Sequence, residues 1–268
     1  MKITTHEGKH TVEFTEGNHR YKVDGEYKKG VTTILGILDK PGLVQWASNK
    51  ACDWIRLNSK VTKESDGDGG VKYSVSESDL KEARYAHRTL KDNSAEIGKR
   101  VHKWIEEHIK GNDTPIDDEM KISVESFLGW EKGHDIEYLN SERITYSEET
   151  DICGTTDSVI LLDGVRTILD FKTGHPDKEY NASKKSYSGL VRGYTTVYMQ
   201  DALYDIAIGE EDKTYADKYA VLYLPTDGGA FYFETAETEH YREMAKLLVK
   251  FDKMYSVADK MMNKYEEV

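Results

Sequence analysis

The chain has 268 residues, of which 38% are hydrophobic and 32% charged, a balance that excludes a disordered or membrane-spanning protein and is typical of soluble globular ones. No run approaches about 18 apolar residues, and the first ten residues lack the apolar stretch of a signal peptide, so we expect a cytoplasmic protein. The net charge of −12 argues against a protein that coats nucleic acid electrostatically, but not against an enzyme that offsets its carboxylates with divalent cations.

The first elements predicted along the chain are a β-hairpin or small meander and two helical segments. Residues 10–30 alternate apolar and polar side chains, which predicts paired strands. A short helical or turn element is expected at 32–38, and the apolar spacing over 43–57 predicts a helix. Residues 58–79 are rich in Ser, Gly, Asp and Lys and predict a long, mobile loop.

Three helices are predicted next, at 78–91, 93–110 and 117–131, and Gly111–Asn112 ends the second as a C-terminal cap. The remaining elements, in chain order, are three strands, a helix, a strand pair and a last helix: 143–147, 153–162, 166–172, 186–208, 217–225, 229–235 and 237–264. This order predicts an α/β or α+β arrangement in layers around one mixed sheet.

The last helix carries apolar residues at alternating steps of three and four: Tyr241, Met244, Leu248, Phe251, Tyr255, Ala258 and Met262. We expect this seam to pack on its own domain. A homo-oligomer formed through the seam is the alternative.

The chain contains two cysteines, Cys52 and Cys153. Two thiols cannot supply a four-cysteine iron–sulfur cluster or a zinc site made of cysteines alone. A disulfide is not expected in a reducing compartment, so both are predicted to be buried free thiols.

The candidate chemistry lies on two strands joined by a tight turn at Asp163–Gly164. Hairpin pairing would bring Asp157 near Asp170, and strand alternation points Asp170 and Lys172 to the same face. Such charged groups are costly to bury without a partner, and a divalent cation held by two carboxylates is one such partner. Oxygen-rich ligation suits Mg²⁺ or Mn²⁺. A structural Asp–Lys pair at a strand end is the alternative.

His102 is a candidate third ligand. It lies on an amphipathic segment whose apolar stripe includes Val101, Trp104 and Ile105. Gly98, one turn earlier, would let a backbone or ligand approach closely. Taken alone, a histidine in this position is more often a hydrogen-bonded core or surface residue than a metal ligand.

Four motifs together resemble the RecB-type nucleases of the PD-(D/E)XK superfamily, which have a QxxxY motif. The motifs are Gly98-Lys-Arg-Val-His102, Gly154-Thr-Thr-Asp157, Asp170-Phe-Lys172-Thr-Gly and Gln200-Asp-Ala-Leu-Tyr204, in that order. The RecB-type nucleases include phage exonucleases, CRISPR-associated adaptation nucleases and the mitochondrial genome maintenance exonuclease. Each motif alone is weak, but four in order on the expected elements are specific, and the likeness covers roughly residues 20 to 235.

The resemblance implies a restriction-endonuclease-like core, α/β (α+β), with a mixed central β-sheet flanked by helices and an N-terminal helical elaboration. It implies one nuclease domain over 1–268, with the elaboration in 1–92, the catalytic core in 93–235 and a C-terminal helix in 236–268.

The resemblance also implies roles for individual residues. His102, Asp157 and Asp170 match metal ligands, with the backbone carbonyl of Phe171 as a further oxygen, and Lys172 matches the catalytic lysine beside the two aspartates. The implied cofactor is one or two Mg²⁺ or Mn²⁺ ions. No iron–sulfur cluster and no nucleotide is expected, because the four cysteines and the phosphate-binding glycine loop are missing.

Further residues are expected to bind DNA or to support the site. Gln200 and Tyr204 match the QxxxY motif. Glu142 precedes the strand before Asp157 and resembles an acidic position often seen there in the family. Basic residues from two stretches that lean positive complete the set: Lys99, Arg100, Lys184, Lys185 and Arg192.

The implied function is a metal-dependent deoxyribonuclease, and more narrowly an exonuclease of replication, recombination or repair, of a phage type. We expect it to act on single-stranded DNA or DNA with free ends in a bacterial or phage-infected cytoplasm, with recombination or replication proteins as partners and no membrane. A structure-selective endonuclease and a catalytically silent DNA-binding or assembly subunit of the same fold are the alternatives.

Overall fold

The computed structural model describes residues 1–38, 41–62, 72–174, 180–181, 186–187, 195–228 and 230–263. They form two compact units, of which the first joins Met1–Ile37 to Arg100–Val268 and the second is Leu38–Lys99. The single domain predicted over 1–268 stays a prediction. Every helix in this described part is too short or too polar to cross a membrane.

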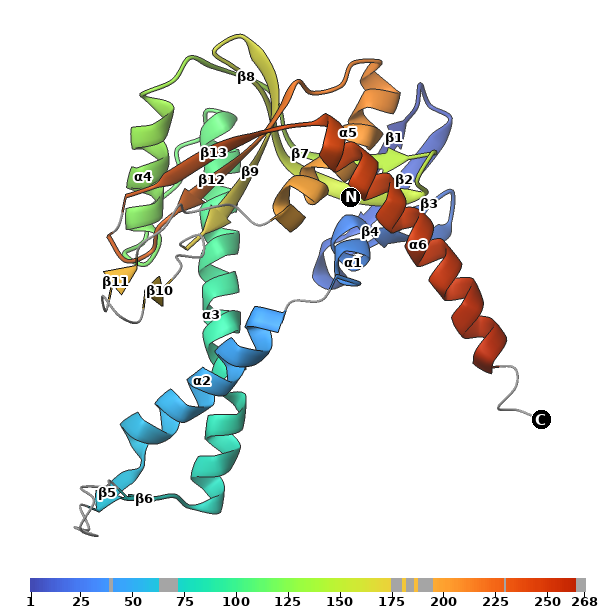
Figure 1. Ribbon diagram of the computed structural model, residues 1–268. Helices are drawn as coiled ribbons and strands as arrows, with labels where there is room; N and C mark the ends of the chain where they lie inside the picture. Colours follow the sequence, from blue (N-terminus) through green and yellow to red (C-terminus); the bar gives the residue numbers. More distant parts are fainter. Residues whose placement is uncertain are drawn as a thin grey trace. The chain divides into compact units, whose positions relative to one another are not determined.

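The first unit is built on a mixed sheet that has nine strands in the described residues (Figure 1). Its strands are β1 (Lys2–Thr5), β2 (His10–Thr15), β3 (Arg20–Val23), β4 (Glu26–Gly30), β7 (Ile136–Ser147), β8 (Ile152–Leu162), β9 (Val165–Thr173), β12 (Lys218–Leu224) and β13 (Tyr232–Glu237). The order is β1-β2-β3-β4-β8-β9-β12-β13, with β7 paired to β8 off this path. The pairs β4–β8 and β9–β12 are parallel and the others antiparallel.

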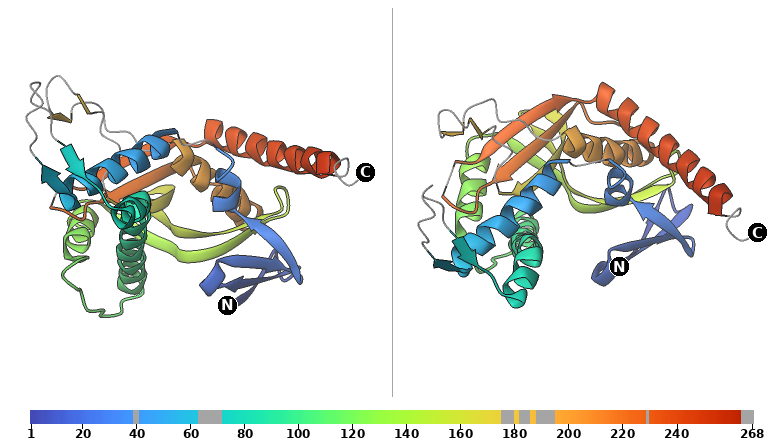
Figure 2. Two further views of the ribbon diagram at one scale, coloured as in Figure 1. Left: turned by 90° about the horizontal axis from the view of Figure 1, so that it is seen from below. Right: turned by 60° about the horizontal axis from the view of Figure 1, so that its bottom comes forward.

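The helices of this unit are α1 (Val31–Leu35), α4 (Lys121–Glu131), α5 (Thr195–Asp212), α6 (Glu239–Asn263) and the last part of α3 (Glu77–Ile109). A short 3-10 turn lies at Glu16–Asn18. α5 packs on β7, β8, β9 and β12, and α4 packs on β12 (Figure 2). The predicted class, a mixed central sheet flanked by helices, is therefore confirmed.

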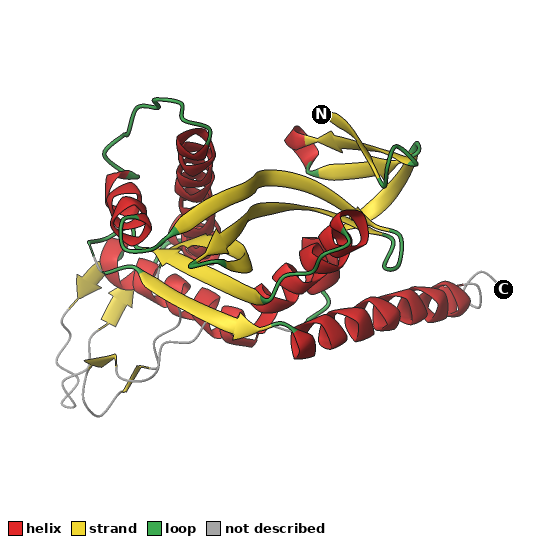
Figure 3. Ribbon diagram, turned by 90° about the horizontal axis from the view of Figure 1, so that it is seen from above, coloured by secondary structure: helices red, strands yellow, loops and turns green. Residues whose placement is uncertain are grey.

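The N-terminal meander is continuous with the long central strands, because β4 runs parallel to β8 at its start (Figure 3). Alternation along β2 and β3 turns one apolar face inward. That face packs on β7 and β8 in one cluster: Val12, Tyr21, Val23, Ile144, Tyr146 and Cys153. The meander predicted over 10–30 is present, and β1, which the pattern missed, extends it.

The hairpin of β8 and β9 turns at Asp163 and Gly164, whose φ angles are 50° and 79°. Two residues with positive φ form the two-residue turn that matches the twist of paired strands, and Asp and Gly tolerate this backbone best. The turn predicted at this point therefore sets the register of the two strands that carry the candidate acids.

α5 is buried almost all round, because it lies between the sheet and α6. The helix predicted over 186–208 is wrong at its start: Ser186–Tyr187 (β11) pairs as a strand with Tyr180–Asn181 (β10), and the described helix begins at Thr195. Tyrosine favours strands, which the helical pattern outweighed in the prediction.

α6 buries a different face from the one predicted. Ala245, Leu248 and Val249 face inward, and Asp252 is held by Lys29 at 2.6 Å. Of the predicted seam, Phe251 is exposed, as are Met244 and Tyr255. The apolar steps alone could not tell which side faced the domain, so the expectation that the whole seam packs inward is wrong.

The second unit contains α2 (Pro41–Asn58), the short pair β5 (Lys60–Thr62) and β6 (Lys72–Ser74), and the first part of α3. The helices predicted at 78–91 and 93–110 are one helix, because the polar residues around 92 lie on its exposed side and no Gly or Pro stands at the expected break. The loop predicted over 58–79 is wrong at both ends, because this range contains β5, β6 and the start of α3, and residues 63–71 lie outside the described part. Cys52 on α2 is exposed, so the expected burial holds only for Cys153.

Candidate active site

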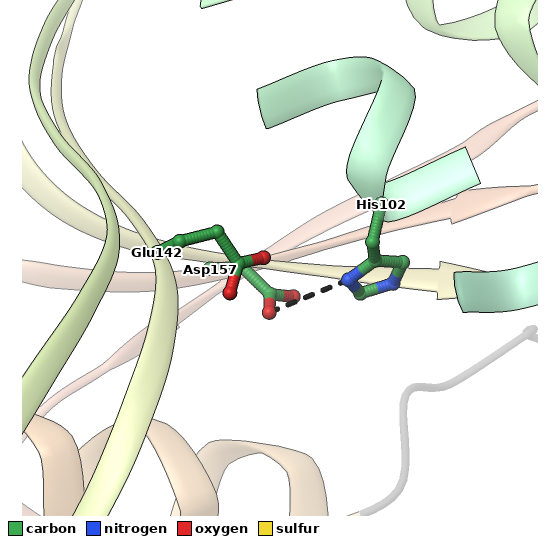
Figure 4. A group of neighbouring side chains, drawn as sticks. All are labelled: His102, Glu142 and Asp157. Carbon is green, nitrogen blue, oxygen red and sulfur yellow. Dashed lines mark ion pairs between the residues drawn. The ribbon is translucent and has the colours of Figure 1, made fainter. Parts of the chain in front are cut away.

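Three side chains from distant parts of the chain converge in the first unit: His102 on α3, Glu142 on β7 and Asp157 on β8 (Figure 4). Each offers one ligand atom, and these atoms all lie within 4.8 Å of one another. His102 Nδ1 lies 3.4 Å from Asp157 Oδ1. We call these three residues the metal group.

The local structure explains how the metal group forms. Ser141 pairs with Ser158 and Arg143 with Thr156, so that Glu142 stands opposite Asp157 across the β7–β8 ladder. β8 and β9 pair only as far as Ser158 and Leu169. Asp157 therefore stands where the two strands begin to part, and Phe171 N–H, freed from the ladder, donates to its Oδ2 at 2.8 Å.

The helix that carries His102 is fixed by its neighbours on the chain. Val101, Trp104 and Ile105 are buried, which leaves the imidazole at the side of the buried stripe. Its ring contacts Phe171 edge-on at 6.0 Å between centroids. The cap predicted at Gly111 is present, with φ at 77° and Asn112 N–H bonded to the carbonyl of Glu107.

The electrostatics of the metal group show acids that repel one another. Burial, and then the charge of Asp157, raise the pKa of Glu142 to about 7. Burial alone would lower the pKa of His102, but the charge and hydrogen bond of Asp157 raise it to about 8. The imidazolium in turn keeps the pKa of Asp157 below its ordinary value despite burial.

Asp170 and Lys172 form an ion pair beside the metal group, with Lys172 Nζ 2.5 Å from Asp170 Oδ2. Burial raises the pKa of Asp170 to about 6, against the lowering effect of the lysine. Burial would lower the pKa of Lys172, but Asp170 and Asp157 together raise it above its ordinary value. The lysine is therefore an ammonium, and not a base, in the protein without a cation.

The QxxxY motif reaches this ion pair from α5. Gln200 Nε2 donates to Asp170 Oδ1 at 3.2 Å and to Tyr204 Oη at 3.1 Å. Tyr204 is 5% exposed, whereas Gln200 is half-buried. The glutamine therefore helps to hold Asp170 in place, and the tyrosine itself offers little surface to a nucleic acid.

Gly154 leaves space for the ring of Tyr204, to which Gln200 donates its hydrogen bond. A Cβ at this position would lie 2.4 Å from Cε1 of Tyr204 and 2.9 Å from Cγ2 of Val31. The glycine of the Gly154-Thr-Thr-Asp157 motif therefore lets the tyrosine ring lie directly on β8, four residues after Gln200 on its own helix.

The donor set fits a divalent cation. One imidazole nitrogen and two carboxylates converge, and a hydrogen bond orients the Asp157 carboxylate. The acids carry negative charge that only His102 offsets within the group, so an ion would relieve their repulsion. Among the described residues this is the only such group.

The structure arranges the sequence-predicted ligands differently from the resemblance. Glu142 joins His102 and Asp157 in the metal group, whereas Asp170 lies outside it and is engaged by Lys172 and Gln200. The contact seen for Phe171 is its backbone N–H, not its carbonyl. The ligand set predicted from the resemblance stays a prediction.

The role predicted for the basic residues stays a prediction. Arg100 is paired with Asp117 and Glu119, and Lys99 is exposed in the second unit. Lys184, Lys185 and Arg192 lie outside the described residues.

The sequence analysis missed Asp201, a fully buried acid that directly follows Gln200. Its charge acts on both Asp170 and Lys172. The sequence gives only part of the signal: Asp201 stands among Met199, Ala202 and Leu203, but its burial depends on the tertiary packing of α5.

No protein-family model matches the sequence, and no curated protein matches it. Among solved structures the chain is similar to the crystal structure of SSO0001, with 20% identity and a TM-score of 0.34 over 67% of this chain and 68% of that one. It is also similar to LHK-Exo in complex with dAMP, with 10% identity and a TM-score of 0.33 over 63% of this chain and 85% of that one. At scores this low, neither likeness assigns an activity to this chain.

Proposed function

We propose that the protein is a metal-dependent deoxyribonuclease that hydrolyses phosphodiester bonds, and more narrowly an exonuclease of replication, recombination or repair. The observation that carries this proposal is the convergence of His102, Glu142 and Asp157 beside the ion pair of Asp170 and Lys172. Mg²⁺ or Mn²⁺ suits a group rich in carboxylate oxygens.

The proposed chemistry divides between the cation and the side chains. A bound divalent cation supplies charge relief to the phosphate and lowers the pKa of water. Lys172, as an ammonium, offsets the negative charge that develops on the phosphate. Asp157 is oriented by Phe171 N–H, and Asp170 by Gln200, so both acids are held before the substrate arrives.

The substrate follows from the same features. The chain carries a net charge of −12, so binding by the general field of the protein is unfavourable, and recognition has to come from local cations and the metal group. A surface hollow of about 310 Å³ between β1 and β7 includes Glu142 in its lining. We propose DNA with free ends as the substrate.

The test is hydrolysis of end-labelled single- and double-stranded DNA with Mg²⁺, with Mn²⁺ and with EDTA, beside a covalently closed circle. We expect cleavage of linear DNA that EDTA abolishes, and an intact circle. Cleavage of the circle would replace the exonuclease with a structure-selective endonuclease. DNA binding without cleavage under any metal would contradict the proposal and indicate the silent subunit.

Lys172→Ala is expected to lower the rate of hydrolysis by at least about 10²–10³-fold, because the phosphate loses its ammonium. The control is Lys218→Ala on β12, a lysine of the same sheet that pairs with Glu237 at a distance from the metal group. Both variants should keep the circular dichroism of the wild type, and Lys218→Ala should also keep its unfolding midpoint. An active Lys172→Ala protein would refute the assignment of the lysine.

A further inference from the structure

α5 carries two buried aspartates one turn apart whose surroundings are opposite. Asp205 is 0% exposed and fully bonded: it accepts from Ala216 N–H at 2.7 Å, Tyr219 Oη at 2.9 Å and Arg242 Nη1 at 2.6 Å. Asp201 is also 0% exposed, yet among the residues that the structure describes neither of its carboxylate oxygens has a hydrogen-bond partner.

A buried carboxylate without a partner is costly, and native proteins rarely keep one without a function. Burial first, and then the charge of Asp170, raise the pKa of Asp201 well above its ordinary range, while Lys172 acts in the opposite direction. A hydrophobic residue would pack more favourably at this helix position. The cost of Asp201 therefore needs a reason other than stability.

Lys172 supplies that reason. Its ammonium has one close partner, Asp170 Oδ2, and the other oxygen of Asp170 is taken by Gln200. Asp170 lies beside the metal group, and if it also engages a bound cation or the substrate, the lysine shares its partner with a positive charge and is repelled. A second acid is then required to keep the ammonium in place.

The other acids near the lysine are already engaged. Asp157 interacts with His102 and with Phe171 N–H, and Glu142 belongs to the metal group. Asp205 is saturated by its three donors. Within the described part of the chain, Asp201 has two carboxylate oxygens without a hydrogen-bond partner, and its charge raises the pKa of Lys172.

We propose that Asp201 is a positioning residue for Lys172: its carboxylate holds the ammonium beside the metal group when Asp170 is engaged by cation and substrate. The inference rests on the proposed function and extends it to a residue outside the metal group. It gives Asp201, the buried acid of the Gln200-Asp-Ala-Leu-Tyr204 segment, a role of its own. That role is separate from the hydrogen bond that Gln200 donates to Asp170.

The experiment replaces Asp201 with the isosteric Asn. We expect Asp201→Asn to lower kcat by roughly 10–100-fold, the range for partners that orient a metal site. The KM for DNA and the Kd for Mn²⁺, measured by calorimetry, should stay within about twofold of the wild type. The Tm of the protein in EDTA should stay equal or rise, because Asp201 has no hydrogen bond to lose.

Asp205→Asn is the matched control on the same helix. Its carboxylate is bonded to Arg242 and two other donors, so its loss should lower Tm by roughly 5 °C or more. Its kcat, measured well below that Tm, should stay within about threefold of the wild type. Asp201→Asn is thus expected to lower kcat and keep Tm, whereas Asp205→Asn is expected to lower Tm and keep kcat.

The outcomes are distinct. An Asp201→Asn protein with wild-type kcat overturns the inference, and so does a fall in Tm like that of Asp205→Asn, which would make the role structural. A weakened Kd for Mn²⁺ with kcat restored at saturating metal would make Asp201 a ligand and also overturn it. Failure of the proposed function is visible earlier, as a wild-type protein that hydrolyses no DNA with either metal.

Discussion

Two groups of the first unit have the same composition, a histidine with two carboxylates, but they differ in geometry. They are the metal group and what we call the surface group: His10, Asp24 and Glu148. In the surface group His10 Nδ1 lies 2.6 Å from Asp24 and Nε2 lies 2.8 Å from Glu148. The two acids therefore bind opposite sides of one ring and share no point at which a cation could sit, whereas the ligand atoms of the metal group converge.

The pKa values separate the two groups more sharply than the distances. A hydrogen bond from Lys9, and then one from His10, lower the pKa of Glu148 to about 2. Burial and Asp157 raise the pKa of Glu142 to about 7. Glu148 thus has countercharges bonded to it, whereas within the described part of the chain no cationic side chain forms an ion pair with Glu142. Of the two groups, the metal group is the one that a cation would stabilise.

Cavity size would have led to the wrong group. The larger surface hollow, about 500 Å³, is lined by His6, Glu148 and Glu210 and lies beside the surface group. The hollow that Glu142 lines has about 310 Å³. The charge that remains unbalanced, and not the volume, distinguishes the candidate site.

The largest effect is expected from exchanging one acid in each group. Asp157→Asn should lower hydrolysis by more than about 100-fold, because Asp157 alone joins His102 to Phe171 N–H in the metal group. Asp24→Asn should leave the rate within about twofold. Rates on end-labelled DNA, with circular dichroism to verify folding, check both variants. Equal losses in the two would erase the functional difference between the groups.

An intermediate effect is expected for stability in EDTA. Because the pKa of Glu142 is raised, the folded protein binds its proton more tightly than the unfolded chain, so this contribution to stability is full below about pH 4.5 and is lost as the pH rises to about 7. Glu142→Gln should therefore raise the free energy of unfolding at pH 8, by up to about 3 kcal/mol, and change it little at pH 4.5.

Glu148→Gln should show the opposite sign. The pKa of Glu148 is lowered, so its contribution is present above about pH 4.5 and is lost as the pH falls toward 2. The glutamine variant should be less stable than the wild type at pH 8. Urea unfolding at both pH values measures the two variants, and shifts of the same sign at pH 8 would contradict the comparison.

The smallest effect is expected for His10→Gln. The hydrogen bond with Asp24, and then that with Glu148, raise the pKa of His10, so its contribution to stability is full below about pH 6.5 and is lost as the pH rises through the raised value. We expect Tm to fall by roughly 1–2 °C at pH 5.5 and by less at pH 8, with no change in hydrolysis. A loss of activity would show that the surface group also serves the reaction.

Local patterns predicted the parts of the fold that local physics determines. Alternation gave the meander over 10–30, and Asp163–Gly164 gave the hairpin turn that sets the register of β8 and β9. The break expected near residue 92 failed, because polar residues on the exposed side of α3 resemble a helix boundary. The buried face of α6 failed for a different reason, since its apolar residues occupy both sides of the helix.

The same limit applies to the candidate site. Asp157, Asp170 and Lys172 were found from the sequence because they interrupt apolar strands close to one turn. Glu142 needed the β7–β8 register, which relates residues 15 positions apart and is set by tertiary pairing. Asp201 needed knowledge that α5 is buried on nearly all sides, because an aspartate on a partly exposed helix would carry no meaning.

The backbone at Glu142 has a consequence for anyone who modifies this protein. Its φ of 49° is a left-handed conformation, which costs a residue with a side chain about 1 kcal/mol or more and costs glycine or asparagine less. A screen for heat tolerance would therefore enrich replacements at this position. The selected variants would gain thermal stability but lose Glu142, one of the three residues of the metal group. Selection at this position should therefore measure the rate of hydrolysis as well as Tm.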